Sequence, residues 1–170
     1  MMKIEEKFLK AHDEYAASIL RHISFRVSDE MLAQDLTQET FFKAWKYVQQ
    51  SGGQLKEINN IKAFLYKVAN NLIIDHYRGK KRFFLSHNSF NEDELVFEPK
   101  QKKEAEISIE MEIVERALMG MDEEYRQIIL YRYIDELSVK EIANITKKTA
   151  NNISVIIHRA LKQLKEKINV

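Results

Sequence analysis

Residues 61–82, IKAFLYKVANNLIIDHYRGKKR, carry the side-chain types that bind nucleic acid. Six Lys and Arg residues against one carboxylate, Asp75, give this stretch a net charge of +5, whereas the whole chain has a net charge of +1. Cations neutralise phosphates, aromatic rings stack on unpaired bases, and amides hydrogen-bond to base edges. The stretch therefore predicts a nucleic-acid-binding surface. A solvated helix whose basic end suits the helix dipole is the alternative that these residues leave open.

The same stretch has the periodicity of one long helix. Its apolar residues recur at intervals of three and four, and they predict a buried stripe made of Ile61, Phe64, Leu65, Val68, Ala69 and Leu72. The opposite side is predicted to carry Lys62, Tyr66, Lys67, Asn70, Asn71, Ile74, Tyr77 and Arg78. We therefore expect the cations, the amides and both tyrosines to face solvent, where a ligand can reach them.

The composition narrows the fold and the class of protein. A chain of 170 residues can form one ordinary domain or two small ones. The absence of cysteine excludes disulfides and Cys-ligated zinc, and it fits a reducing cytoplasm. No apolar run approaches the roughly 18 to 20 residues that span a membrane, and the start, MMKIEEKFLK, mixes charges unlike a signal peptide. Four glycines and one proline leave little turn chemistry for sheets, so we expect an all-α intracellular protein.

Charge is distributed unevenly along the chain. Residues 61–82 and 138–170 each have a net charge of +5. Residues 83–112, which directly follow the first of these stretches, have a net charge of −5. Residues 83–108 show no sustained periodicity and contain the only proline, Pro99. We therefore expect two small helical domains, residues 1–82 and 109–170, joined by a flexible acidic linker over residues 83–108.

Two further helices are expected in the first domain. Residues 3–27 predict one helix or a broken pair, and residues 29–50 predict a second helix that Ser28 can cap. The buried face of the second helix is predicted to consist of Leu32, Leu36, Thr40, Ala44 and Val48. The residues that must then point largely away from the core are Asp35, Gln38, Glu39 and Lys43.

The C-terminal residues have the pattern of a helix-turn-helix. Helical periods over residues 109–121 and 122–137 come first. Ser138 and Glu141 then have the spacing of a capping box, and Thr149 is a candidate N-cap for a longer helix that ends near residue 167. The apolar seam between the two helices is predicted to comprise Ile142, Ile145, Ile153, Ile157, Leu161 and Leu164. A helical hairpin that does not bind DNA is the alternative left open here.

Three motifs in this order resemble the sigma-70 family of bacterial transcription initiation factors. They resemble in particular the extracytoplasmic-function type, which has only the second and fourth conserved regions. AQDLTQETFFKAW, residues 33–45, is similar to the family's core-polymerase-binding motif, and AFLYKVANNLIIDHYRGKKR, residues 63–82, is similar to its promoter-melting helix. The region from Ala117 resembles the promoter-reading fourth region through Glu141–Ala143 and the pair Arg159 and Ala160. The resemblance covers residues 12–82 and 113–168.

The resemblance implies roles for individual residues. A basic coiled coil of the polymerase large subunit would be bound by Asp35, Gln38 and Glu39. Minus-10 DNA would be contacted by Tyr66, Lys67, Asn70, Asn71, Tyr77, Arg78, Lys80 and Lys81. A flipped base would lie in a pocket formed by residues 51–60. Minus-35 DNA would be contacted by Asn151, Asn152, Ser154, Val155, His158 and Arg159.

The sequence departs from the family pattern at several positions. Ser154 and Ile156 stand where the family commonly has Lys or Arg, so we expect weak or unusual minus-35 recognition. Lys147 replaces a turn glycine, and a non-glycine residue with a positive φ costs on the order of 1 kcal/mol. Asp122 replaces the proline that usually precedes the first helix of this domain.

The sequence thus predicts a sigma factor that recognises minus-10 and minus-35 promoter elements and melts DNA, without catalysis, metal or cofactor. Its partners would be core RNA polymerase, promoter DNA and, by family habit, an anti-sigma factor, with no membrane contact of its own. The acidic linker would thread a basic polymerase channel or would simply be solvated.

Two other functions compete with this prediction. A stand-alone helix-turn-helix regulator accounts only for residues 113–170. A metal-dependent nuclease would use Asp35, Glu39, Asp75 and His76, but no metal-ligand spacing recurs in the sequence.

Overall fold

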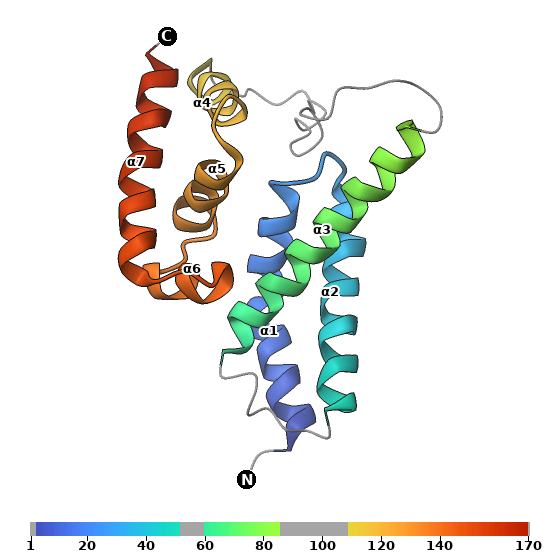
Figure 1. Ribbon diagram of the computed structural model, residues 1–170. Coiled ribbons are helices and arrows are strands. Elements are labelled where there is room, and N and C mark those ends of the chain that lie inside the picture. The colour runs from blue at the N-terminus through green and yellow to red at the C-terminus, as the bar shows by residue number, and fades with distance from the viewer. Residues whose placement is uncertain (1–2, 52–59, 86–108, 170) are drawn as a thin grey trace. The chain divides into compact units, whose positions relative to one another are not determined.

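The computed structural model describes residues 3–51, 60–85 and 109–169, and for residues 81–85 it describes the backbone alone. The described residues form helices and short connections, and no strand occurs among them. The prediction of an all-α fold is confirmed. The chain divides into two compact units, Met1–Lys100 and Gln101–Val170 (Figure 1).

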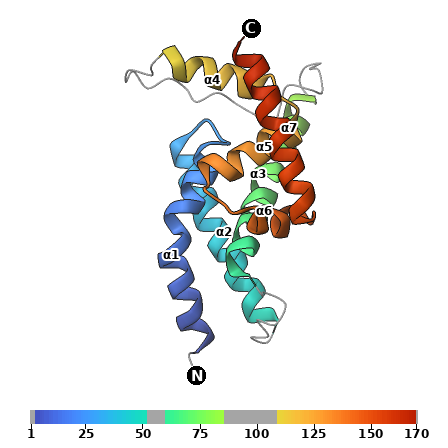
Figure 2. The same cartoon turned by 90° about the vertical axis from the view of Figure 1, so that its left-hand side faces the viewer.

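The first unit is a bundle of three helices. These are α1 (Ile4–Ser24), α2 (Glu30–Gln50) and α3 (Ile61–Leu85), and each packs against the other two (Figures 1 and 2). Helix α1 is continuous, so the broken pair is excluded. The side chains of Ile19, Ile23, Val48 and Leu65 are almost completely buried at the centre of the bundle.

Helix α2 separates its buried and exposed faces as predicted, except that Leu32 is only half-buried. Leu36, Thr40, Ala44 and Val48 are buried, and the Thr40 hydroxyl donates to the Leu36 carbonyl at 2.7 Å, which satisfies a polar group inside the core. The predicted cap is wrong by one residue. Asp29, not Ser28, is the N-cap, and its carboxylate accepts a hydrogen bond from the Met31 backbone N–H at 3.0 Å.

Helix α3 buries a stripe that matches the predicted one only in part, at Leu65, Ala69 and Leu72. Its buried residues are Leu65, Tyr66, Ala69, Leu72, Ile73 and Tyr77, whereas Ile61, Phe64 and Val68 are half-buried. The prediction that Tyr66 and Tyr77 face solvent is therefore wrong, because α1 and α2 both cover α3 and bury both rings. A tyrosine ring suits either environment when its hydroxyl finds a partner. The Tyr77 hydroxyl donates to the Arg26 carbonyl, and the Tyr66 ring meets the His22 ring edge-to-face at 4.9 Å.

Buried polar groups connect the end of α1 to α3. His22 and Arg26 are 0% and 2% exposed. The His22 Nε2 lies 2.9 Å from the Asn70 Oδ1, and the Arg26 guanidinium donates to the His22 carbonyl at 2.8 Å. With Tyr77, these residues form what we call the α1–α3 polar cluster: His22, Arg26, Asn70 and Tyr77. Because buried polar groups are costly without partners, the cluster favours one register of α3 against α1.

The second unit is built on one long helix. Its elements are α4 (Ile109–Met119), α5 (Glu123–Ile129), the π-helical turn η2 (Leu130–Ile134), α6 (Val139–Thr146) and α7 (Ala150–Ile168). Helix α7 packs against α4, α5 and α6 (Figure 1). Met121, Ile129 and Ala160 form a buried cluster, and Leu118, Tyr125 and Leu164 pack against it.

The caps predicted for α6 and α7 are confirmed. The Ser138 hydroxyl accepts from the Glu141 N–H at 3.2 Å, and the Glu141 carboxylate accepts from the Ser138 N–H at 2.7 Å. The Thr149 hydroxyl accepts from the Asn152 N–H at 3.1 Å. These bonds satisfy N–H groups that have no partner within their own helix, so the sequence itself fixes where both helices begin.

Asp122 has a structural role in place of the proline. It precedes α5, and its backbone N–H donates to the Gln163 side-chain oxygen at 3.2 Å. The Gln163 amide donates in return to the Asp122 carboxylate at 3.0 Å. This reciprocal pair fastens the start of α5 to the C-terminal half of α7.

Two residues among those described, other than glycine, have a positive φ. Lys147 follows α6 with a φ of 58°, as the missing turn glycine predicts, and Glu136 has a φ of 55°, which was not predicted. Each side chain carries a steric cost of about 1 kcal/mol in this left-handed conformation. The turn before α6 and the turn between α6 and α7 therefore each contain a residue whose backbone conformation glycine would adopt more easily.

We expect Lys147→Gly to stabilise the protein by about 1 kcal/mol, because glycine adopts this φ without a steric penalty. Lys140→Gly is the matched control, since Lys140 is an exposed lysine inside α6. It should destabilise the protein by about 0.7 kcal/mol. Urea denaturation followed by far-UV circular dichroism measures both changes. Destabilisation by Lys147→Gly would contradict the strain assigned to the turn.

We expect Tyr77→Phe to destabilise the protein by about 1–2 kcal/mol, because it removes the hydroxyl that donates to the buried Arg26 carbonyl. Tyr133→Phe serves as the control. The Tyr133 side chain is 51% exposed, and its substitution should change stability by less than about 0.5 kcal/mol. Thermal unfolding is the measurement, and equal midpoints for Tyr77→Phe and the parent protein would exclude an energetic role for this bond.

Candidate polymerase-binding and DNA-binding surfaces

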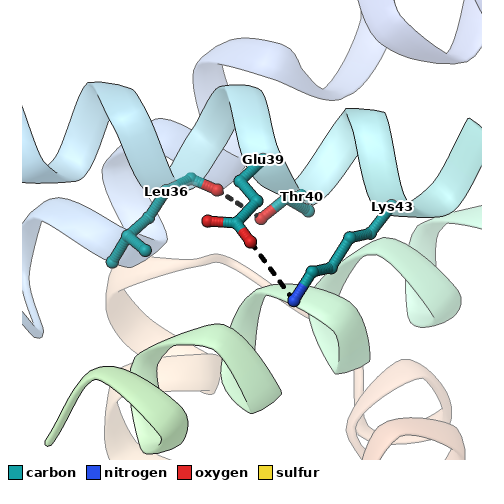
Figure 3. Close-up of polar contacts among 4 residues, drawn as sticks. All are labelled: Leu36, Glu39, Thr40 and Lys43. Atoms are coloured by element: carbon teal, nitrogen blue, oxygen red, sulfur yellow. Dashed lines mark hydrogen bonds and ion pairs between the residues drawn. The ribbon is translucent and has the colours of Figure 1, made fainter. Parts of the chain in front are cut away.

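The exposed face of α2 presents carboxylates beside an amide. Asp35, Gln38 and Glu39 are all exposed, as the sequence predicts. The Glu39 carboxylate lies 3.2 Å from the Lys43 ammonium one turn later, and both side chains are about half exposed (Figure 3). Next to Glu39, the buried Thr40 hydroxyl donates to the Leu36 carbonyl (Figure 3). The ion pair adds little stability, but it helps to hold the Glu39 side chain in one orientation.

Two apolar residues on this face were missed by the sequence analysis. Met31 is 72% exposed and Phe42 is 59% exposed. Met31, Asp35, Gln38 and Phe42 follow one another at intervals of four, three and four, and the exposed Glu39 lies beside them, four residues after Asp35. We call these five residues the α2 stripe. Met31 and Phe42 lie on the helix face opposite the predicted buried stripe, and this position in the sequence could have identified them as exposed. Methionine and aromatic residues are enriched at protein-binding surfaces, so these two exposed side chains are compatible with one.

The exposed face of α3 carries cations and an amide. Lys67, Asn71, Ile74 and Arg78 are exposed and follow one another at intervals of four, three and four, which places them on one stripe. Asp75 is exposed beside them.

The other candidates for minus-10 contact lie elsewhere. Tyr66 and Tyr77 are in the core, and Asn70 is half-buried and engaged with His22. Lys80 is half-buried, and the side chain of Lys81 lies outside the described residues, as do residues 52–59 of the expected base pocket. The structure thus brings together three of the eight predicted residues, Lys67, Asn71 and Arg78, as one solvent-facing stripe.

All six predicted residues on α7 face solvent. They are Asn151, Asn152, Ser154, Val155, His158 and Arg159. The buried side of the same helix is formed by Ile153, Ile156 and Ala160. Ile156, which stands where the family commonly has Lys or Arg, is 6% exposed and therefore belongs to the core. The predicted seam also misplaced Leu161, which is 39% exposed.

Residues of α5 and η2 support α6 and α7 through polar contacts. The Glu124 carboxylate lies 2.9 Å from the Lys148 ammonium and so joins the first turn of α5 to the turn before α7. The Arg132 guanidinium donates to the Leu137 carbonyl at 2.9 Å. Arg126 is buried in α5, and this burial lowers the pKa of its guanidinium while the charge of Glu123 acts in the opposite direction. These contacts fix the approach of the chain to α6.

The described residues include no candidate metal site and no candidate membrane span. Within residues 3–51, 60–85 and 109–169, no three His, Asp or Glu side chains lie where they could hold a metal ion. This includes Asp35, Glu39, Asp75 and His76, the set considered for a nuclease. No helix in the described part of the chain is long and apolar enough to cross a membrane.

Comparisons with known proteins match both units. The family model for sigma-70 region 2 matches residues 9–83, and the model for sigma-70, region 4 matches residues 111–164. The RNA polymerase sigma factor YlaC of Bacillus subtilis is 26% identical over 167 residues, which cover 97% of this chain and 94% of YlaC. The ECF RNA polymerase sigma factor BldN of Streptomyces coelicolor is 26% identical over 163 residues, 94% of this chain. The chain spans 59% of the length of BldN.

A solved structure is similar in fold. In its complex with the anti-sigma factor NepR, the sigma factor RpoE from Bartonella quintana aligns with a TM-score of 0.62 and 20% identity, over 98% of this chain and 96% of RpoE. The two region models lie in the same order as the predicted motifs, and together they match more than half of the chain. The chain therefore belongs to the sigma-70 family, within its extracytoplasmic-function (ECF) group of RNA polymerase sigma factors.

Proposed function

We propose that this protein is a sigma factor that binds core RNA polymerase and directs promoter-specific initiation of transcription. Its first unit would bind the polymerase and melt the minus-10 element, and its second unit would bind the minus-35 element. One observation carries this proposal. The acidic stripe of α2 and the cationic stripe of α3 are both exposed in a single three-helix bundle, so one rigid body offers a surface for a basic protein and another for DNA.

The α2 stripe supports polymerase binding through both charge and apolar contact. Asp35 and Glu39 complement a basic coiled coil, and such complementarity raises association rate and specificity. Met31 and Phe42 add exposed apolar surface at the two ends of the stripe. Burying one such side chain contributes about 1.5–3 kcal/mol. The apolar ends would thus supply affinity while the carboxylates select the partner.

The α3 stripe supports contact with the minus-10 element. Lys67 and Arg78 can neutralise phosphates, and the Asn71 amide can reach a base edge. Because Tyr66 and Tyr77 are in the core, we leave both out of the proposed DNA contacts. Extruding a base costs a few kcal/mol, so stacking for a flipped base must come from residues outside this stripe.

An anti-sigma factor would regulate the protein. RpoE, which shares its fold, is found with the anti-sigma factor NepR. The exposed apolar residues of α2 would gain as much from such a partner as from polymerase. The protein would act in the cytoplasm beside polymerase, and it would perform no covalent chemistry of its own.

A stand-alone helix-turn-helix regulator accounts for less of the chain. It uses only the second unit and gives no role to the match with sigma-70 region 2 at residues 9–83. Specific binding of promoter DNA by the isolated protein at physiological salt, with no requirement for core polymerase, would favour the regulator.

The combined change Asp35→Lys and Glu39→Lys is expected to abolish run-off transcription with core RNA polymerase and to prevent co-purification with it, because it reverses both charges of the α2 stripe. Asp13→Lys with Glu14→Lys is the matched control, since both residues are exposed carboxylates on α1. This control should keep full transcription. If the α2 variant binds core as the parent does, α2 is not the polymerase-binding surface.

The combined change Lys67→Gln and Arg78→Gln is expected to weaken the promoter complex of the holoenzyme at any minus-10 sequence. The slope of log K against log salt should fall by about 2, because two phosphate contacts are lost. Lys7→Gln with Lys10→Gln, two exposed lysines of α1, should leave the slope unchanged. An unaltered slope in the α3 variant would remove both residues from the DNA interface.

A further inference from the structure

The first two turns of α7 carry no charge. Residues 149–157 contain no Lys, Arg, Asp, Glu or His. After the cap Thr149 and the small Ala150, which are also exposed, the exposed side chains of these turns are Asn151, Asn152, Ser154 and Val155. In a helix-turn-helix, the N-terminal residues of the second helix are the ones that reach base edges. The side chains placed to read bases are therefore two amides, a hydroxyl and an exposed aliphatic group.

The amides match adenine better than guanine. A carboxamide has one acceptor and one donor group side by side, and adenine presents N7 as an acceptor and N6–H₂ as a donor in the major groove. Guanine presents two acceptors, N7 and O6, which pair best with the two parallel donors of arginine or with lysine. Asn151 and Asn152 are exposed and can meet adenine in this way, whereas these two turns offer no guanidinium or ammonium.

The hydroxyl of Ser154 is restricted to accepting hydrogen bonds from DNA, so it offers guanine no donor. It donates its proton to the Ala150 carbonyl at 3.1 Å. A hydroxyl has a single proton, so only its lone pairs remain for DNA. It can accept from adenine N6 or cytosine N4, but it has no proton left to donate to guanine.

Val155 adds an apolar contact. Its side chain is 41% exposed although it lies on a polar face. Its methyl groups are of the kind that pack against the C5-methyl group of thymine, which is the one apolar feature of the major groove.

Cations flank the uncharged turns. Lys140 on α6 and Lys147 in the turn come before them, Arg159 and Lys162 follow on α7, and all four are exposed. Contacts to phosphate position a helix on the duplex but do not identify bases. The charged residues can therefore hold α7 in the groove while the uncharged turns face the bases.

We propose that α7 selects a minus-35 element of A·T pairs, with adenine read by the amides of Asn151 and Asn152 and thymine read by Val155, and that it has no guanine contact in these turns. This inference rests on the proposed sigma-factor function. It goes further in naming the base pairs that the second unit recognises and the residues that select them.

The test uses the full chain with core RNA polymerase and a promoter library in which both the minus-35 and the minus-10 segments are randomised. Sequencing the run-off transcripts or the bound templates gives the preferred base at each position. We expect A·T pairs to be enriched, and a single change to G·C at a contacted pair to lower initiation on the order of tenfold.

Two variants assign the readout to residues. Asn152→Arg should shift one position of the selected element to guanine, and Val155→Ala should remove a thymine preference at one position. Asn169→Arg adds the same side chain at the exposed far end of α7 and should leave the selection unchanged.

The possible failures are distinguishable. Transcripts that start specifically but show a G·C preference, or no preference, at the minus-35 segment would overturn the inference and leave the sigma-factor function standing. Altered selection by Asn169→Arg but not by Asn152→Arg would also overturn it. Absence of initiation from every library member would overturn the proposed function, and this inference with it.

Discussion

The position of α3 depends on buried polar groups at and just after the end of α1. In the α1–α3 polar cluster, hydrogen bonds join His22 to Asn70, Arg26 to His22, and Tyr77 to Arg26. Apolar packing alone tolerates rotation of a helix about its axis, but buried polar groups lose their partners when a helix rotates. The cluster therefore determines which side of α3 is exposed. The cationic stripe of Lys67, Asn71 and Arg78 faces solvent as a consequence of what lies on the opposite side.

In the second unit, caps and turns help to position α6 and α7. Ser138, Glu141 and Thr149 determine where α6 and α7 begin, and Lys147 adopts a strained conformation between them. Contacts from outside the helix pair then hold it in place. The Glu124–Lys148 ion pair supports the turn, and the Asp122–Gln163 pair supports the far half of α7. The contacts to α5 and its N-cap therefore offset the strain at Lys147 and hold the exposed side of α7 in place.

The sequence predicted features that depend on local chemistry. The caps of α6 and α7 and the exposed polar face of α2 follow from short-range spacing, and the structure confirms them, whereas the cap of α2 is Asp29 and not Ser28. The positive φ of Lys147 was expected from the resemblance, because the family has a glycine at this turn. The prediction from the sequence failed where tertiary packing decides between two environments that suit a side chain equally. Tyr66 and Tyr77 are amphipathic, so only the positions of α1 and α2 show that both are buried. In the run of three apolar residues from Val155 to Ile157, periodicity alone did not identify Ile156 as the buried one.

The reciprocal amide pair between Asp122 and Gln163 also limits how modular the recognition helix is. It joins residues 41 positions apart, so half of α7 relies on a segment that precedes the helix-turn-helix. A graft of α6 and α7 onto another scaffold would transfer the caps but leave the Gln163 side chain without its partner at the start of α5. Natural recombination or engineering that exchanges promoter specificity between such proteins would therefore need to move α5 together with the helices that follow it.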